Sequence, residues 1–116
     1  MAYYIRAKSY YKYALDLFKD LPKLKDNPAE FQKRAQEIFK LGMKAVWSLS
    51  YITPPEKSPE FKELWEKTVE SLDPKDIPEI GKIKDILFSD RSDKEKILKG
   101  TKTFLEIIKK ILQPIL

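Results

Sequence analysis

Four short segments carry the residues that begin α-helices, and they constrain the fold of this chain more than any other feature of its sequence. In chain order they are Asn27-Pro28-Ala29-Glu30, Ser58-Pro59-Glu60, Asp73-Pro74 and Ser92-Asp93-Lys94-Glu95. Each combines a capping side chain, which accepts a hydrogen bond from a free backbone amide, with a proline or an early carboxylate. They divide the chain into about five helical segments.

Apolar residues within these segments recur every three or four positions, the spacing of one helix face. We expect helices over residues 2–20, from Pro28 to Ile52, from Ser58 to residue 72, over a shorter stretch within 74–89, and from a Ser92–Glu95 capping box to Pro114. No segment alternates with the period of a strand. The sequence therefore predicts an all-α fold, a single-domain up-and-down bundle of four long helices and one short one over residues 1–116.

Three small residues on the seam of the second predicted helix indicate close packing. Ala35, Gly42 and Ala45 face the same way, and glycine inside a helix costs up to about 1 kcal/mol relative to alanine. We therefore expect the backbone of another helix to cross closely at this point.

The chain has no cysteine and no histidine, which removes many classes of chemistry. Thiolate nucleophiles, disulfides, cysteine metal sites and histidine acid–base catalysis are all excluded. Carboxylates at helical spacing, Asp16 with Asp20 and Glu63 with Glu66 and Glu70, fall on the polar sides of their helices and are interpreted as surface charge. We expect no enzyme activity, catalytic residue, metal or cofactor.

The net charge of +5 comes mainly from lysine, since only three of the 23 basic residues are arginine. A surface rich in lysine and glutamate fits a heat-adapted, archaeal-like intracellular protein, and with no apolar stretch of about 20 residues we expect a cytoplasmic location away from membranes. The last predicted helix has a basic polar face, formed by Lys94, Lys96, Lys99, Lys102, Lys109 and Lys110. This face is either solvated or binds phosphates or an acidic partner.

Several aromatic and apolar residues are candidates for a protein interface, because three of the predicted helices carry more apolar residues than one packing face needs. The candidate interface residues are Trp47, Tyr3, Tyr10 and Leu116. Trp47 lies off the main seam and is the strongest of them, with packing against a further helix as the alternative. The tyrosines near the start of the chain alternate with cations, which also suits single-stranded nucleic acid, although core packing is the favoured interpretation. Tyr13 is the tyrosine that we expect to point outward.

Three stretches resemble the HEPN superfamily of small helical bundles, which occur in prokaryotic toxin–antitoxin pairs and beside nucleotidyltransferases. They are the aromatic segment 10–17, the helix through 35–46, and the turn Asp90-Arg91-Ser92 before the last helix, Lys94 to Leu112. Catalytic members are RNases in which an arginine is followed by a histidine. Arg91 matches the position of that arginine but no histidine follows, so the resemblance implies a non-catalytic module that dimerises or partners another protein.

The sequence thus favours a non-enzymatic helical interaction module, which self-associates or is the helical partner of another protein. The alternative is a nucleic-acid-binding protein that uses the lysine- and tyrosine-rich faces of the first and last helices.

Overall fold

A computed structural model describes residues 2–51, 53, 55–90 and 93–116, apart from the side chains of residues 2 and 3. Its α-helices are α1 (Ala2–Asp20), α2 (Pro28–Ser48), α3 (Phe61–Ser71), α4 (Ile77–Leu87) and α5 (Lys94–Leu112). Three short 3-10 helices accompany them: η1 (Leu21–Leu24), η2 (Pro74–Asp76) and η3 (Gln113–Ile115). The described residues contain no strand, which confirms the predicted all-α class.

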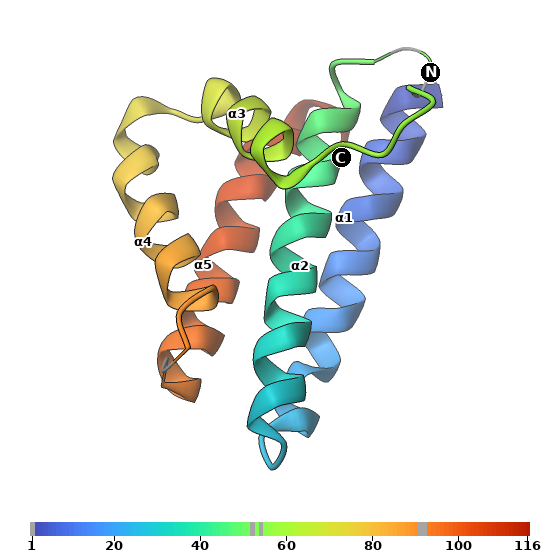
Figure 1. Cartoon of the computed structure of the whole chain (residues 1–116). Coiled ribbons are helices and arrows are strands. Elements are labelled where there is room, and N and C mark those ends of the chain that lie inside the picture. Colours follow the sequence, from blue (N-terminus) through green and yellow to red (C-terminus); the bar gives the residue numbers. More distant parts are fainter. Residues whose placement is uncertain (1, 52, 54, 91–92) are drawn as a thin grey trace.

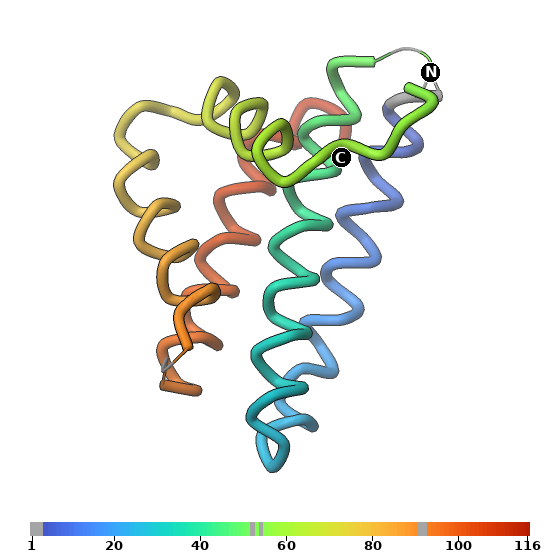
Figure 2. The backbone as a smooth tube through the Cα atoms, in the orientation of Figure 1, coloured from blue at the N-terminus to red at the C-terminus, as the bar shows by residue number. Residues whose placement is uncertain are grey.

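The helices form a bundle in which four run alternately up and down (Figures 1 and 2). α1 packs along α2, α2 also contacts α3 and α5, and α4 packs on α5. α3 departs from the predicted up-and-down order, because it lies across the end of the bundle at which α1 begins (Figure 1). α3 and α4 have 11 residues each, so three helices are long where the sequence predicted four.

Two of the predicted helix starts are capped as expected. The side chain of Asn27 accepts from the amide of Glu30 at 3.3 Å, with Pro28 as the first residue of α2. The side chain of Asp73 accepts from the amide of Lys75 at 3.1 Å and opens η2 rather than an α-helix. Both caps satisfy amides that have no partner within the helix.

The predicted starts at Ser58 and Ser92 need correction. α3 begins at Phe61, after a Glu60 whose side chain makes no capping bond, so Ser58 belongs to the preceding loop. The cap of α5 is Asp93, whose carboxylate accepts from the amide of Glu95 at 3.5 Å, whereas Ser92 lies outside the described residues. An aspartate caps as well as a serine, and sequence alone did not discriminate between these neighbours.

α2 ends at Ser48, short of the predicted end at Ile52, which lies outside the described residues. The amides of Leu49 and Ser50 bond to carbonyls three residues back, at 3.1 and 3.0 Å, so the helix tightens and stops. The loop that follows is tied to α1, because Nη2 of Arg6 donates to the carbonyl of Tyr51 at 2.6 Å.

Four aromatic rings from three other parts of the chain surround Phe39, which is fully buried; we call these five rings the aromatic cluster. Phe39 stacks on Phe104 of α5 with ring centroids 4.3 Å apart, and on Phe61 and Trp65 of α3 at 6.4 and 6.3 Å. Phe88, directly after α4, meets Phe39 edge-on at 5.9 Å. Offset and edge-on rings attract beyond the area they bury, so this cluster joins α2 to α3, α4 and α5.

Gly42 lies one turn after Phe39, and its missing side chain makes room for Phe104. A Cβ at this position would lie 2.4 Å from Cε2 of Phe104, too close for any real contact. The predicted close approach at Gly42 therefore exists, but a ring of α5 makes it rather than a helix backbone. Phe104 is fully buried against Phe39 and has little freedom to move aside.

We expect Gly42→Ala to lower the free energy of unfolding by about 1–3 kcal/mol, the usual cost of overpacking a core, despite the better helix propensity of alanine. Gly81→Ala in α4 is the matched control, because a Cβ there would meet nothing within 4 Å. That control should raise stability by up to about 1 kcal/mol. Chemical denaturation of both variants measures the two signs, and a Gly42→Ala variant at least as stable as the unsubstituted protein would contradict the packing at Gly42.

Candidate functional site

The residues predicted to form an interface lie in different environments. α2 and α5 end where α1 begins (Figure 2), so Trp47 and Leu116 share one end of the bundle. Leu116 is 50% exposed, whereas Tyr10, in the middle of α1, is half-buried with the ammonium of Lys44 6.0 Å from its ring centroid. The side chain of Tyr3 lies outside the described part of the chain.

Trp47 is a core residue, which corrects its assignment as an exposed interface residue. Its side chain is only 5% exposed and its ring lies 4.9 Å from that of Tyr51. The alternative interpretation of Trp47, that it packs on a second side of α2, is therefore the correct one. Its indole nitrogen is buried and makes no hydrogen bond to the described residues.

The predicted basic face of α5 is divided by local contacts. Lys94 donates to the carbonyl of Lys25, and Lys110 pairs with Asp76 at 2.8 Å. Lys96, Lys99, Lys102 and Lys109 are exposed, and none has an ion-pair partner among the described residues. Acidic residues border Lys110, since Asp76, Glu79 and Glu106 line a recess together with it. The face is therefore basic mainly at these four lysines.

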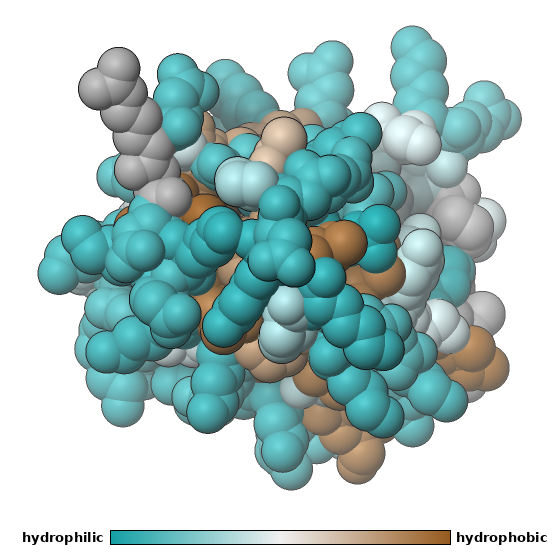
Figure 3. Space-filling model, turned by 90° about the horizontal axis from the view of Figure 1, so that it is seen from below, coloured by the Kyte–Doolittle hydropathy of each residue, from teal (hydrophilic) through white to brown (hydrophobic). Residues whose placement is uncertain are grey.

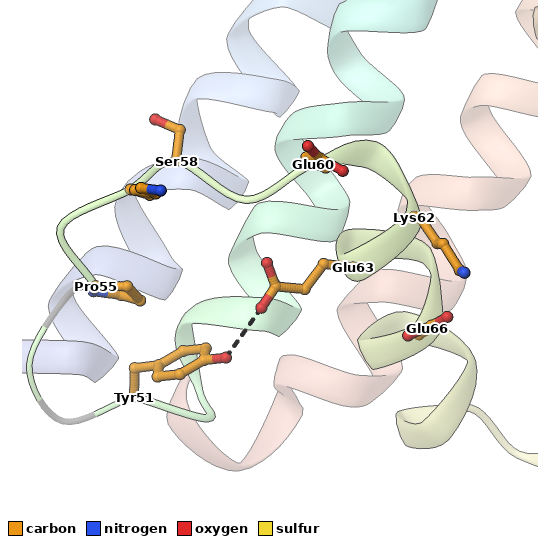
Figure 4. A pocket seen from close by; sticks show the side chains of 8 residues that line it. Tyr51, Pro55, Ser58, Glu60, Lys62, Glu63 and Glu66 are labelled. Atoms are coloured by element: carbon orange, nitrogen blue, oxygen red, sulfur yellow. Dashed lines mark hydrogen bonds between the residues drawn. The ribbon is translucent and has the colours of Figure 1, made fainter.

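A wide recess of about 610 Å³ opens between the loop after α2 and the first turns of α3 (Figure 4). Glu63 reaches toward Tyr51, whose hydroxyl donates to it at 3.3 Å, while Glu66 lies further along α3, away from that contact. The carboxylates that line the recess do not converge, and the described residues include no group of three or more acids placed to hold a metal ion. These glutamates are exposed surface charge, as predicted.

The outer face of α1 exposes large apolar side chains. Ile5 is 65% exposed, Tyr13 55% and Leu15 39%. Tyr13 thus points outward as predicted, whereas Ile5 and Leu15 were not singled out in the sequence. α1 is the outermost long helix beside α2 (Figure 1), and the other described residues leave this face uncovered.

A second apolar surface, which the sequence did not indicate, lies where α2, α3 and the end of α4 meet. We call it the aromatic groove, a recess of about 400 Å³ lined by Lys40, Phe61, Lys84, Asp85 and Phe88. Phe88 is 38% exposed, and its ring meets Phe61 edge-on at 5.2 Å. The ammonium of Lys84 lies 4.4 Å from the ring centroid of Trp65.

Two glutamines of α2 hold the end of α4 and thereby position Phe88. Nε2 of Gln32 and of Gln36 donate to the carbonyl of Leu87 at 2.9 and 2.8 Å, and Gln32 also donates to the carbonyl of Ser89. Leu87 is the last residue of α4, so no later amide of the helix is available to its carbonyl. Neither Phe61 nor Phe88 stands out in the sequence, because nothing in the sequence near either residue indicates that the two rings meet.

Comparisons of the chain with protein-family models, curated proteins and solved structures found no match. The resemblance to the HEPN superfamily therefore stays a prediction, and Arg91, which carried part of it, lies outside the described residues. Within the described residues, no helix combines the length and apolar character needed to cross a membrane.

We expect the double substitution Gln32→Ala and Gln36→Ala to loosen the end of α4. The double substitution removes three side-chain hydrogen bonds, which contribute about 1 kcal/mol each, so the free energy of unfolding should fall by about 3 kcal/mol. The amide of Phe88, bonded to the carbonyl of Lys84 at 3.0 Å, should exchange with solvent faster. Gln113→Ala is the control, since its exposed side chain makes no hydrogen bond to the described residues. Unchanged exchange at Phe88 would contradict this anchoring role.

Proposed function

We propose that the protein is a non-enzymatic helical interaction module that self-associates through the outer face of α1. The observation that carries the proposal is the exposure of Ile5 and Tyr13, at 65% and 55%, on a helix at the edge of the bundle. Exposed apolar patches on single chains are characteristic of interfaces. The HEPN resemblance implies the same kind of role, a dimer or a helical partner.

The charges on this face suit a second copy of the same chain. Lys8 and Lys12 lie in the first half of α1. Asp16 and Asp20 lie in its second half, together with the cation of Lys19. A two-fold symmetric dimer with antiparallel α1 helices sets the first half of one copy against the second half of the other. Lys12 then faces Asp16 of the partner, while the apolar side chains beside them are covered.

The dissociation constant of this dimer is measured by light scattering coupled to size exclusion over a concentration series. We expect Ile5→Glu and Tyr13→Glu each to raise it at least about tenfold, since a buried glutamate costs more than 1.4 kcal/mol. Ile77→Glu, at an apolar residue 36% exposed on α4, is the matched control and should leave it unchanged. A strict monomer at high micromolar concentration would overturn the proposal.

A charge exchange tests the antiparallel arrangement itself. Lys12→Asp should weaken the dimer because it places two carboxylates opposite each other, and adding Asp16→Lys in the same chain should restore it. In a parallel arrangement Lys12 faces its own copy, so the double exchange would give no such recovery.

Nucleic-acid binding by α5 is a second candidate, supported by the exposed and unpaired Lys99, Lys102 and Lys109 described above. Anisotropy of labelled single- and double-stranded RNA and DNA, measured at several salt concentrations, tests it. Replacing all three lysines with glutamine should reduce the logarithmic salt slope by about two to three, as each phosphate contact contributes about 0.7–0.9. The control is the same replacement at Lys57, Lys62 and Lys82, which removes equal charge outside α5. Equal loss of binding in both triple variants would argue against a site on α5.

A further inference from the structure

We infer that the aromatic groove binds a small aromatic anion, a planar ring that carries one anionic group such as a carboxylate or sulfonate. Its volume of about 400 Å³ falls within the range of about 300–1,000 Å³ that is typical of small-molecule sites. The groove is formed by α2, α3 and the end of α4 and includes no residue of α1. The inference therefore goes beyond self-association and does not depend on it.

The walls of the groove suit a planar ring. Phe88 is 38% exposed and Phe61 half-buried, and the two rings meet edge-on at 5.2 Å with an interplanar angle of 73°. This arrangement presents a ring face and a ring edge to the same recess, and a third ring can stack on one and meet the other edge-on. Phe39 packs against both phenylalanines and fixes them in place.

The charges around the groove suit an anion. Lys40 and Lys84 line it together with one acid, Asp85, and none of the three has an ion-pair partner among the described residues. The ammonium of Lys84 is already placed over Trp65 at 4.4 Å, so it loses less freedom on binding a ligand than an unrestrained lysine. Asp85 disfavours a second anionic group and can accept a hydrogen bond from a donor on the ring.

The extent of the apolar lining favours a small molecule over a protein segment. The adjoining recess shares Phe88 but is otherwise lined mainly by polar groups, among them Gln32, Gln36 and Asp90. Figure 3, a view from below, shows apolar areas in the middle, at the lower edge and at the right, with hydrophilic side chains between them. An amphipathic helix needs a continuous apolar stripe, whereas one ring needs only the two phenylalanines.

The two tryptophans allow a test with an internal reference. In a ¹⁵N–¹H correlation spectrum the indole of Trp65 reports on the groove, through Lys84, while the indole of Trp47 reports on the core elsewhere. The probes are naphthalene-2-sulfonate, its neutral counterpart 2-naphthylmethanol, and the aliphatic anion octane-1-sulfonate. We expect naphthalene-2-sulfonate to shift Trp65 and not Trp47, and to bind at least about tenfold more tightly than either counterpart, since both ring and charge contribute.

Substitutions separate the roles of charge and ring. Lys40→Gln and Lys84→Gln should each raise the dissociation constant of naphthalene-2-sulfonate about three- to tenfold. Lys102→Gln, the same change at an exposed position of α5, should leave that constant unchanged. Phe88→Ala should raise it more than about tenfold. Phe88→Leu keeps the apolar bulk but removes the ring, so it should weaken binding while the fold stays intact. Tyr13→Ala removes an aromatic ring from α1 and is the control, which should leave binding of the probe unchanged.

Either of two results would overturn the inference. One is equal affinity for octane-1-sulfonate and naphthalene-2-sulfonate, which would indicate a nonselective apolar surface. The other is binding that Lys40→Gln, Lys84→Gln and Phe88→Leu leave unchanged. Variants of Ile5 that abolish self-association should bind the probe normally, so failure of the two proposals can be told apart.

Discussion

Stacking of aromatic rings on Phe39 determines how three of the five helices are placed. The ring projects from α2 into the core, and α3, the end of α4 and α5 each contribute an aromatic ring that contacts it. Interiors are packed as densely as organic crystals, so a ring of this size has few allowed arrangements of neighbours. Gly42, one turn further along α2, supplies the space that brings Phe104 within 4.3 Å of Phe39. α1 takes no part in the cluster and packs along α2 instead.

This division leaves the molecule with two surfaces of different character. The outer face of α1 is broad, with apolar residues between charges of both signs, which suits a flat contact between two copies. The aromatic groove is small and concave, and its charge is mainly positive. Lysines have different roles across the surface: Lys84 lies over Trp65, Lys94 binds a carbonyl and Lys110 binds a carboxylate. A net charge of +5 therefore says little about which cations remain to meet a ligand.

The fold class, the five helical segments and some boundaries, such as the start of α2, could be predicted because they depend on local signals. Capping at Asn27 and the three-four spacing of apolar residues act within one or two turns. The start of α3 and the burial of Trp47 could not be predicted, because they depend on which helices lie next to these residues. The aromatic groove was beyond prediction for the same reason: Lys40, Phe61 and Phe88 are distant in the sequence, and nothing in their local patterns indicates that they meet.

The anchoring of α4 has a consequence for the order in which the molecule opens. With 11 residues each, α3 and α4 are too short to persist as isolated helices in water, and α4 relies on glutamines of α2 to satisfy the carbonyl of Leu87, its last residue. We therefore expect this part of the chain to open before α1 and α2 separate. A molecule bound between α2, α3 and α4 would slow this first step of unfolding. It would thereby also stabilise helices that it does not contact.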